Sequence, residues 1–288
     1  MNKIAENQIA NYFLDKKIEA RTILSNSFNM ICEKILLQNN EAFVVKYYQN
    51  KKNEFNSIIS EKNSLSYLAN ITSLVPKIKF NSNELLIIDY IENNDIKDKN
   101  YQVILAEVIS KIHQNTNNRY GFQFDAQIGA LKQTNEFTDN WVIFFRDKRL
   151  NSIFELINNN NPMASHINQR IEKLLKNIHN FIPNNPIPRL LHGDLWAGNI
   201  ICEQNHLKGF IDPAIYFANP EIELAFSTLF STFNHTFFDR YKEHRIINPG
   251  FFEERRHVYN LYPLLVHLRL FGVKYLTKLE KILTRLGV

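Results

Sequence analysis

The stretch Leu190–Asn199 reads LLHGDLWAGN and is the densest polar cluster of the 288-residue chain. Asp194 and Asn199 stand five positions apart in it, and the two glycines of the stretch permit sharp turns. Asp212 follows thirteen positions after Asn199, and the residues between them predict a short hairpin. Because a hairpin folds back on itself, we expect the side chains of Asp194, Asn199 and Asp212 to meet at one point.

These three side chains suit phosphoryl transfer, which depends on positioning and charge more than on covalent chemistry. One carboxylate must orient the attacking hydroxyl and accept its proton, a role for Asp194. Carboxylate and amide oxygens are ligands that Mg²⁺ prefers, a role for Asn199 and Asp212. The alternative is an Asx-rich turn whose side chains only cap backbone groups. The matching Asp212 and the apolar residues on both sides of the stretch favour the kinase site.

An ATP site also needs a cation for the phosphates and a place for adenine. Lys46 ends the strand-like run FVVK, and Glu61 lies on the helix predicted next. In kinase-like folds a strand lysine paired with a helix glutamate holds the phosphates. We expect adenine to rest near Asp89 and Ile91, because a largely apolar slot still needs polar anchors.

One part of the predicted ATP site departs from the usual composition. The segment Ser25–Met30, ahead of the first predicted strand, contains no glycine. Loops that cover phosphates use glycine because it lets the backbone approach the nucleotide closely. Here serine and asparagine would have to supply the turn and the hydrogen bonds.

The wider pattern predicts an α+β protein with a small β-rich N-lobe and a mainly helical C-lobe. The first part alternates strands with a helix, at Ile31–Leu37, Ala42–Tyr48, Ser57–Leu68, Ile78–Phe80 and Leu85–Tyr90. Beyond it, apolar residues recur at helical spacing around Ile104–Ile112, Ile167–Ile178 and Leu279–Leu286. We place the nucleotide-binding lobe at residues 1–91 and the catalytic and substrate lobe at 92–288, with Glu92–Asp95 as the connector.

Composition excludes several classes of protein. The apolar fraction of 44% argues against disorder. The net charge of +5 is not clustered, so no nucleic-acid partner is expected. No stretch approaches the length of a membrane span and no apolar leader is visible, so we expect a cytoplasmic protein that is a monomer or weak dimer. Cys32 and Cys202 fit no metal or redox spacing and are expected to be small buried hydrophobes.

Together these residues resemble the fructosamine kinase (ketosamine 3-kinase) family, within the aminoglycoside phosphotransferase and protein-kinase-like superfamily. The resemblance covers nearly the whole chain and is loosest over the N-lobe. It rests on Leu190–Asn199, the run DPAIYF from Asp212, Glu221–Ala225, Asn140-Trp141, Gly250-Phe251, Arg255 or Arg256, Tyr259–Tyr262, Leu264–Leu268 and Leu270–Gly272. HGD-x-x-x-x-N alone is shared across the superfamily, whereas Trp196 and the Asp-Pro-Ala-x-Tyr run narrow the assignment.

The resemblance implies a protein-kinase-like two-lobed fold and ATP- and Mg²⁺-dependent phosphorylation of the 3-hydroxyl of ketosamines, the fructosamine and ribulosamine adducts of amines. The 3-phosphate adduct decomposes and frees the amine, so the role implied is deglycation and protein repair. By position Asp194 would be the base, Asn199 and Asp212 the metal ligands, Lys46 the phosphate anchor and Glu61 its partner. The family has a glycine pair where this chain has Asn26-Ser27, and Cys32 is offset from a redox-sensitive cysteine of some members.

Other residues of the motif regions have less specific signals. Trp196 is expected to form one wall of the sugar site, because aromatic faces suit the apolar side of a sugar. Glu221 and Glu223 begin a helix after Pro220, where carboxylates stabilise the helix dipole; they could equally meet the cationic amine of a substrate. His192 is expected to be structural, His267 is expected to be a core residue, and the Phe-rich segment Phe226–Phe238 is expected to be ordinary core.

Two rival functions remain from the sequence. An aminoglycoside- or choline-type kinase would share the catalytic loop, but polycationic substrates call for several acidic residues around the cleft. A nucleotide-binding pseudokinase scaffold is suggested by the missing glycines. Turnover of ketoamines in the presence of ATP and Mg²⁺ separates the three.

Overall fold

The computed structural model describes residues 2–50, 55–94 and 99–288. The chain forms two compact units, which we treat separately. Unit 1 comprises residues 1–97 together with 199–213, and unit 2 comprises residues 98–198 together with 214–288. The predicted division between residues 91 and 92 stays a prediction. The predicted connector Glu92–Asp95 ends at Asp95, which lies outside the described residues.

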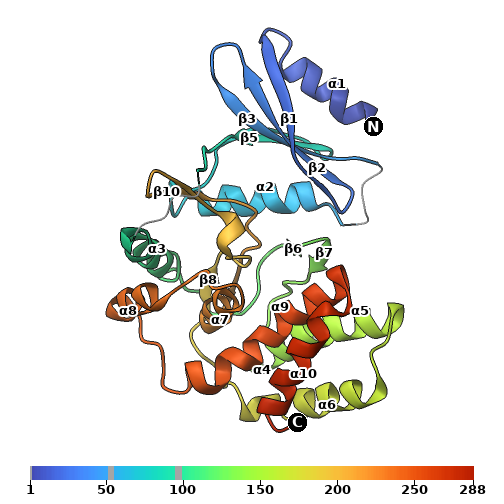
Figure 1. Cartoon of the computed structure of the whole chain (residues 1–288), viewed down its shortest axis with the longest axis vertical. Coiled ribbons are helices and arrows are strands. Elements are labelled where there is room, and N and C mark those ends of the chain that lie inside the picture. The colour runs from blue at the N-terminus through green and yellow to red at the C-terminus, as the bar shows by residue number, and fades with distance from the viewer. Residues whose placement is uncertain (1, 51–54, 95–98) are drawn as a thin grey trace. The chain divides into compact units, whose positions relative to one another are not determined.

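Unit 1 is built on a five-stranded antiparallel sheet of order β1-β2-β3-β5-β4 (Figure 1). Its elements are α1 (Lys3–Tyr12), β1 (Ile18–Ser27), β2 (Met30–Leu37), β3 (Ala42–Tyr48), α2 (Ser57–Leu68), β4 (Ile78–Asn81), β5 (Leu85–Asp89), β9 (Ile200–Glu203) and β10 (His206–Phe210). The predicted strands and the predicted helix at 57–68 are confirmed. Neither α1 nor β1 was expected from the sequence.

The two faces of this sheet serve different purposes. Successive side chains of a strand point to opposite faces, so Val45 and Lys46 of β3 face in opposite directions. Val45 belongs to a core cluster with Ile35 of β2, Ile87 of β5 and Ile9 of α1. On the other face, Lys46 reaches α2. The sheet therefore has an apolar face that packs against α1 and a second face that carries charged groups toward α2.

The structure corrects the interpretation of Ser25–Met30 as a loop ahead of the first strand. Ser25–Ser27 end β1, and Ser27 pairs with Met30 at the start of β2. The turn between them is Phe28-Asn29, with φ of 52° and 66°. Two consecutive residues in the left-handed region are typical of a type I′ hairpin turn. The sequence hides β1 because all ten of its residues are exposed, so no apolar alternation marks it.

Unit 2 is mainly helical, and the segments in which apolar residues recur at helical spacing form helices as predicted. Its elements are α3 (Lys99–Ile112), β6 (Ala126–Ile128), β7 (Leu131–Gln133), α4 (Trp141–Ile143), the π-helical η1 (Phe144–Asn151), α5 (Ser152–Asn160), α6 (Ser165–Lys176), η2 (Ile178–Asn180), β8 (Arg189–Leu191), η3 (Ala197–Asn199, which ends in unit 1), β11 (Tyr216–Ala218), α7 (Glu221–Leu229), α8 (His235–His244), the π-helical η4 (Phe251–Arg255), α9 (Arg256–Phe271), η5 (Val273–Tyr275) and α10 (Leu276–Arg285). The helix expected to run from Ile167 through Ile178 ends earlier, because α6 stops at Lys176 and Ile178 begins a short 3₁₀ helix.

The core of unit 2 is rich in aromatic side chains around α9. Trp141 is fully buried and stacks on Phe144 and Phe145, while its indole N–H donates to the Tyr259 hydroxyl at 3.2 Å. Aromatic rings bury large apolar areas, and a buried indole N–H needs a partner. The residue pair Asn140-Trp141 thus begins a helix that packs on α9.

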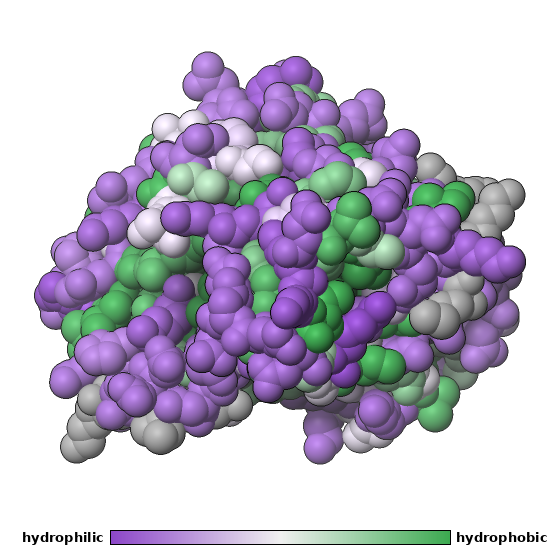
Figure 2. Space-filling view, turned by 90° about the horizontal axis from the view of Figure 1, so that it is seen from above, coloured by the Kyte–Doolittle hydropathy of each residue, from purple (hydrophilic) through white to green (hydrophobic). Residues whose placement is uncertain are grey.

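The surface is mixed. Hydrophilic residues cover most of the face drawn from above, and hydrophobic side chains show between them (Figure 2). Within the described residues, no helix combines the length and hydrophobicity needed to cross a bilayer.

Candidate active site

Unit 1 brings Lys46, Glu61 and Asp212 together. Lys46 extends from β3, and only 8% of the residue is exposed. Its ammonium donates to Glu61 Oε1 of α2 at 2.6 Å and also forms an ion pair with Asp212 Oδ1. A buried charge is costly unless it is paired. The sequence prediction of a strand lysine beside a helix glutamate agrees with this geometry.

The charges of this triad support one another. Burial acts to lower the pKa of Lys46, but the carboxylates of Asp212 and Glu61 outweigh it and raise that pKa. Burial and the negative charge of Asp212 raise the pKa of Glu61 to about 7, against the opposing effect of Lys46. Lys46 is therefore held as a cation beside two carboxyl groups. The same surroundings raise the pKa of the Cys32 thiol to about 11, chiefly through burial, which disfavours a reactive thiolate.

The β9–β10 hairpin relates Asn199 to Asp212. Ile200 of β9 pairs with Phe210 of β10, and the Ile211 N–H donates to the Asn199 carbonyl at 3.0 Å. Asp212 follows in the left-handed region with φ of 54°, a conformation that Asp tolerates better than most residues. Its side chain is 46% exposed. The hairpin thus places Asn199 and Asp212 at its two open ends, as the sequence predicted.

The predicted adenine segment begins at the end of β5, whose last residue is Asp89. The Asp89 carboxylate lies 3.0 Å from the Lys79 ammonium, and the N–H groups of Asp89 and Tyr90 both donate to backbone carbonyls of the sheet region. Within the described residues, the Ile91 N–H donates to no backbone carbonyl. This segment therefore offers one main-chain donor, at Ile91.

Unit 2 carries the base candidate on the loop after β8. This strand pairs with β11, and the Ala214 N–H donates to the His192 carbonyl at 2.8 Å. Gly193 has φ of 88°, and a Cβ there would lie 1.9 Å from the Ala214 carbonyl oxygen. Only glycine allows this approach. The HGD loop and the segment that follows Asp212 are thereby fixed to each other within unit 2.

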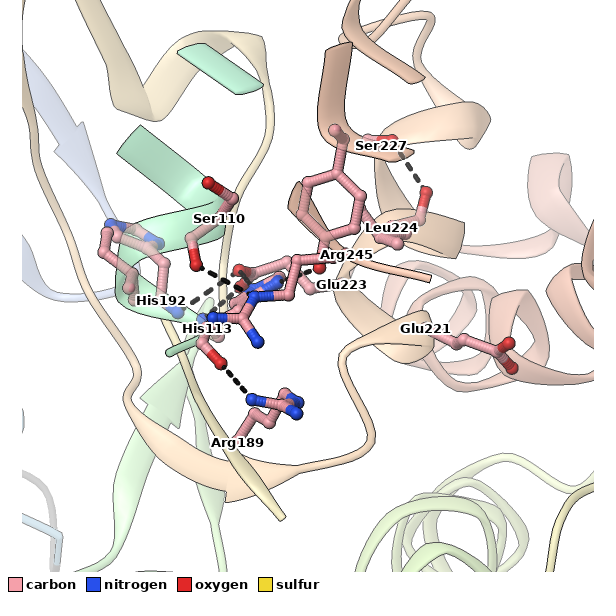
Figure 3. Close-up of polar contacts among 12 residues, drawn as sticks. Ser110, His113, Arg189, His192, Glu221, Glu223, Leu224, Ser227 and Arg245 are labelled. Carbon is pink, nitrogen blue, oxygen red and sulfur yellow. Dashed lines mark hydrogen bonds and ion pairs between the residues drawn. The ribbon is translucent and has the colours of Figure 1, made fainter. Parts of the chain in front are cut away.

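Glu223 anchors the same loop through hydrogen bonds to its backbone. Its carboxylate accepts from the N–H of Gly193 at 2.7 Å and of His192 at 3.4 Å, and lies 3.0 Å from His113 Nε2 (Figure 3). The other ring nitrogen of His113 lies 2.7 Å from the Tyr241 hydroxyl. Burial acts to raise the pKa of Glu223, but His113, His192 and the Gly193 N–H outweigh it and hold that pKa below its usual range.

Glu221, two residues earlier on α7, points away from this cluster (Figure 3). Its two carboxylate oxygens accept from Arg255 Nε and Nη2 at 2.7 and 2.6 Å, a bidentate pair. Both glutamates are thus engaged inside the protein and lie in the first turn of the helix, as the dipole interpretation expected. Their contact with a substrate amine stays a prediction.

A cavity of about 400 Å³ opens beside Asp194 within unit 2. Its lining is mostly aromatic and aliphatic, from Trp196 of the stretch Leu190–Asn199, Phe226 of α7, Phe230 just after α7 and Tyr262 of α9. Ligand pockets have this size and this predominance of apolar groups around a few polar ones. The arrangement can hold a small acceptor with its hydroxyl next to a carboxylate.

Trp196 forms part of the cavity wall and is 40% exposed, with its ring centroid 6.4 Å from that of Phe230. Its indole also covers Gly198, where a Cβ would lie 2.4 Å from the ring. The position on the wall agrees with the sequence prediction, while contact with a sugar stays a prediction.

Two sequence expectations are corrected at this cavity. His267 is not a core residue, because its half-buried ring lines the cavity between Phe230 and Phe271. The segment Phe226–Phe238, expected to be ordinary core, contributes Phe226 and Phe230 to the wall. Helical periodicity reports which face is apolar, and it does not separate a core from an apolar pocket.

Sequence reasoning also missed His113, which lies 110 positions from Glu223 in the chain. It sits at the end of α3 without any motif around it. Only the fold shows that it is the buried partner of Glu223.

The chain matches a family model described as fructosamine kinase over residues 2–287. A protein of Enterococcus faecium named as a probable ketoamine kinase is 31% identical over 84% of this chain and 86% of its own length. A protein-ribulosamine 3-kinase of Oryza sativa subsp. japonica, described as chloroplastic, is 35% identical over 60% of this chain and 51% of its own length.

Solved structures share the fold over the full chain. A candidate fructosamine-3-kinase from Thermobifida fusca has a TM-score of 0.87 at 21% identity and covers 100% of both chains. An aminoglycoside phosphotransferase in complex with streptomycin and ATP has a TM-score of 0.65 at 16% identity, covering 99% of this chain and 96% of its own. The expected α+β, kinase-like fold is therefore confirmed.

Proposed function

Because the chain belongs to the fructosamine kinase family, we propose that it phosphorylates the 3-hydroxyl of ketosamines, the fructosamine and ribulosamine adducts of amines, with ATP as donor. The observation that carries this proposal is the aromatic cavity of about 400 Å³ with Asp194 in its lining. The proposal of a 3-hydroxyl acceptor is also supported by the name of the Oryza relative, a protein-ribulosamine 3-kinase.

Asp194 acts as the base. A carboxylate beside the acceptor hydroxyl orients it and takes its proton as the bond to phosphorus forms. Glu223 and Gly193 fix the loop that carries Asp194, so that its carboxylate is positioned before the acceptor enters. Trp196 offers a flat apolar face to the sugar.

The donor half of the reaction falls to unit 1. Asn199 and Asp212 supply the amide and carboxylate oxygens that suit Mg²⁺, and the half-exposed Asp212 carboxylate is accessible. The metal, when bound, neutralises charge on the phosphates. Lys46, oriented by Glu61, holds the donor phosphates, and the Ile91 N–H together with the backbone near Asp89 anchors adenine.

The product carries a phosphate at position 3 of the sugar. The adduct is unstable, and its decomposition frees the amine, which makes the overall role deglycation. We place this activity in the cytoplasm, with the protein as a monomer or weak dimer.

The rival acceptors fit the cavity less well. Asp194 and Glu223 are the acidic residues of its lining, and Glu223 is already engaged by the catalytic loop and His113. Lys274 and His267 stand on the same wall. A polycationic aminoglycoside would meet two acidic side chains and a lysine among these lining residues, which is poor charge complementarity.

The test is turnover with matched acceptors. The purified protein is incubated with ATP and Mg²⁺ and with ribulosyl-lysine, fructosyl-lysine, choline or kanamycin, and ADP release is measured. We expect release with a ketoamine, and ³¹P NMR of the product should place the phosphate on C3. Turnover of kanamycin or choline alone would overturn the acceptor. ATP binding without turnover of any acceptor would favour the pseudokinase.

A further inference from the structure

A second cavity of unit 2, of about 550 Å³, is lined on one side by α9 and on another by α10. Its polar lining includes Arg256, His257, Asn260, Lys278, Lys281 and Arg285. It shares none of its residues with the cavity beside Asp194. None of the described residues that line it is acidic. We call it the basic cavity.

The cations of the basic cavity lack carboxylate partners. Among the described residues, no carboxylate forms an ion pair with Arg256, Lys278, Lys281 or Arg285. Lys278 donates to the Leu229 carbonyl at 3.3 Å and Arg285 to the Glu253 carbonyl at 3.1 Å, and neither bond neutralises the charge. Some other cations of unit 2 do pair with acids, as Arg240 does with Glu107 at 2.6 Å. The basic cavity is therefore a local excess of positive charge.

The spacing of the cations along α10 makes this excess of positive charge destabilising for the helix. Lys278, Lys281 and Arg285 follow at i, i+3 and i+7 and so lie on one face of α10. Like charges three and four residues apart on a helix destabilise it. A concave site with one sign of charge also focuses the electrostatic field and attracts ions of opposite charge. A bound anion would relieve the repulsion.

Buried polar atoms also point to a missing partner. Arg256 Nε, His257 Nε2 and Asn260 Oδ1 are buried without a hydrogen-bond partner among the described residues. Asn260 is 4% exposed, and its amide nitrogen donates to Thr228 Oγ1 at 3.1 Å. Thr228 Oγ1 donates its one proton to the Ala225 carbonyl at 2.7 Å, so the amide keeps this orientation, and Arg256 Nε is the buried N–H donor that faces an anion. Buried polar groups are nearly always satisfied.

We propose that the basic cavity binds the phosphate group of a small phosphorylated molecule. A phosphate ester brings two negative charges to these four cations and so compensates more of their charge than a single carboxylate does. Guanidinium groups such as Arg256 and Arg285 match phosphate oxygens well. The cavity volume lies in the range of small-molecule sites. The charges gather in one hollow and not along an extended stripe, which argues against a nucleic acid.

The pKa of His257 can report whether an anion binds in the basic cavity. Burial and the positive charges of Arg285 and Arg256 lower the pKa of His257 to about 4. An anion in the cavity counters those charges and should raise this pKa. His179, an exposed residue of η2, is an internal control because it lies outside the lining.

The experiment follows the imidazole signals of the full-length protein by NMR as pyrophosphate or inorganic phosphate is added, with the His257 signal assigned from its loss in His257→Asn. We expect a saturable shift of His257 with a dissociation constant of about 1 mM or tighter, and no shift of His179. The paired change Lys281→Met/Arg285→Met should weaken binding by about tenfold or more, because charge-assisted hydrogen bonds are lost. The single change Lys281→Met, which keeps the bond between Arg285 and Glu253, should give a smaller loss.

The matched control is Lys111→Met/Lys176→Met, which removes two exposed cations elsewhere in unit 2 and should leave binding unchanged. Three results would overturn the proposal. One is a His257 signal that pyrophosphate does not saturate. Another is equal binding by the Lys281→Met/Arg285→Met variant. The third is a shift of His257 by a single-stranded oligonucleotide but not by pyrophosphate, which would indicate a nucleic-acid surface.

Discussion

Glu223 and Gly193 are joined by a hydrogen bond of 2.7 Å, in which the backbone N–H of Gly193 donates to a carboxylate that is almost fully buried. Asp194, the next residue, lines the cavity of about 400 Å³. The buried Glu223 of α7 thus holds the loop that carries Asp194, the proposed base, through main-chain atoms. We therefore propose Glu223 as a positioning residue.

The change Glu223→Gln tests this relationship. The amide keeps the size of the side chain but loses the negative charge that receives the Gly193 and His192 N–H groups. We expect kcat to fall by about tenfold or more, equivalent to about 1.4 kcal/mol, while the KM for ATP changes little.

The matched control is Glu221→Gln, in the same helical turn and equally buried but directed at Arg255. It should lower thermal stability and leave kcat near that of the wild type. If both variants lower kcat equally, the cause is a general disruption of helix α7 and not the contact between Glu223 and the loop. If only Glu221→Gln raises the KM for the ketoamine, Glu221 contacts the substrate amine.

The change Asp194→Asn tests the base. An amide cannot accept the proton of the acceptor hydroxyl, so turnover should be abolished, while ATP affinity should stay nearly intact because the role concerns the acceptor. Steady-state kinetics and isothermal titration with ATP measure the two effects. Turnover within tenfold of the wild type would show that Asp194 is not the base.

The aromatic wall predicts a graded effect at Trp196. The change Trp196→Ala should raise the KM for the ketoamine by about tenfold, because it removes a large apolar face and frees the backbone at Gly198. The change Trp196→Phe keeps an aromatic face and should lose less. The KM for ATP serves as the control. An equal KM for the ketoamine in both variants and the wild type would show that Trp196 does not contact the sugar.

Stability at acidic pH should depend on Glu223. Its pKa in the folded protein lies below the ordinary 4.5. A depressed carboxyl pKa stabilises the folded state above the unfolded value, and that contribution is lost as the pH falls through the folded value. Thermal unfolding temperatures should therefore drop as the pH falls below about 4.5. Glu223→Gln should show a weaker dependence in that window, and an identical pH profile would contradict the assignment.

The sequence predicts those parts of the fold that carry an apolar period or a polar motif. Strands β2 and β3 and helix α2 follow from alternation and helical spacing, and the hairpin between Asn199 and Asp212 follows from two apolar runs around a polar turn. Strand β1 escapes because its side chains are all exposed, so its pairing with β2 is decided by backbone hydrogen bonds.

For the candidate site, the sequence identifies the residues of the catalytic stretch but not their supports. Lys46 and Glu61 are found because strand and helix are each recognisable and consecutive. His113 is missed, and Arg255 or Arg256 is noted only as part of the family resemblance, without its pairing to Glu221. Each of His113 and Arg255 meets its glutamate through contacts distant in sequence that no local pattern records. The role of His267 is missed because a pocket wall and a core face have the same helical period.

Asp212 yields a prediction for the metal that does not depend on the acceptor. Its carboxylate forms the ion pair with Lys46 through Oδ1 and is half exposed, so it can serve both the lysine and a cation. The change Asp212→Asn keeps an oxygen ligand but removes the charge, so we expect the Mg²⁺ concentration for half-maximal activity to rise by about tenfold or more. A Mg²⁺ titration at saturating ATP and ketoamine measures this shift. Glu61→Gln, which also removes a charge beside Lys46, is the control and should alter the KM for ATP more than the Mg²⁺ requirement. An unchanged Mg²⁺ titration in Asp212→Asn would remove Asp212 from the metal site.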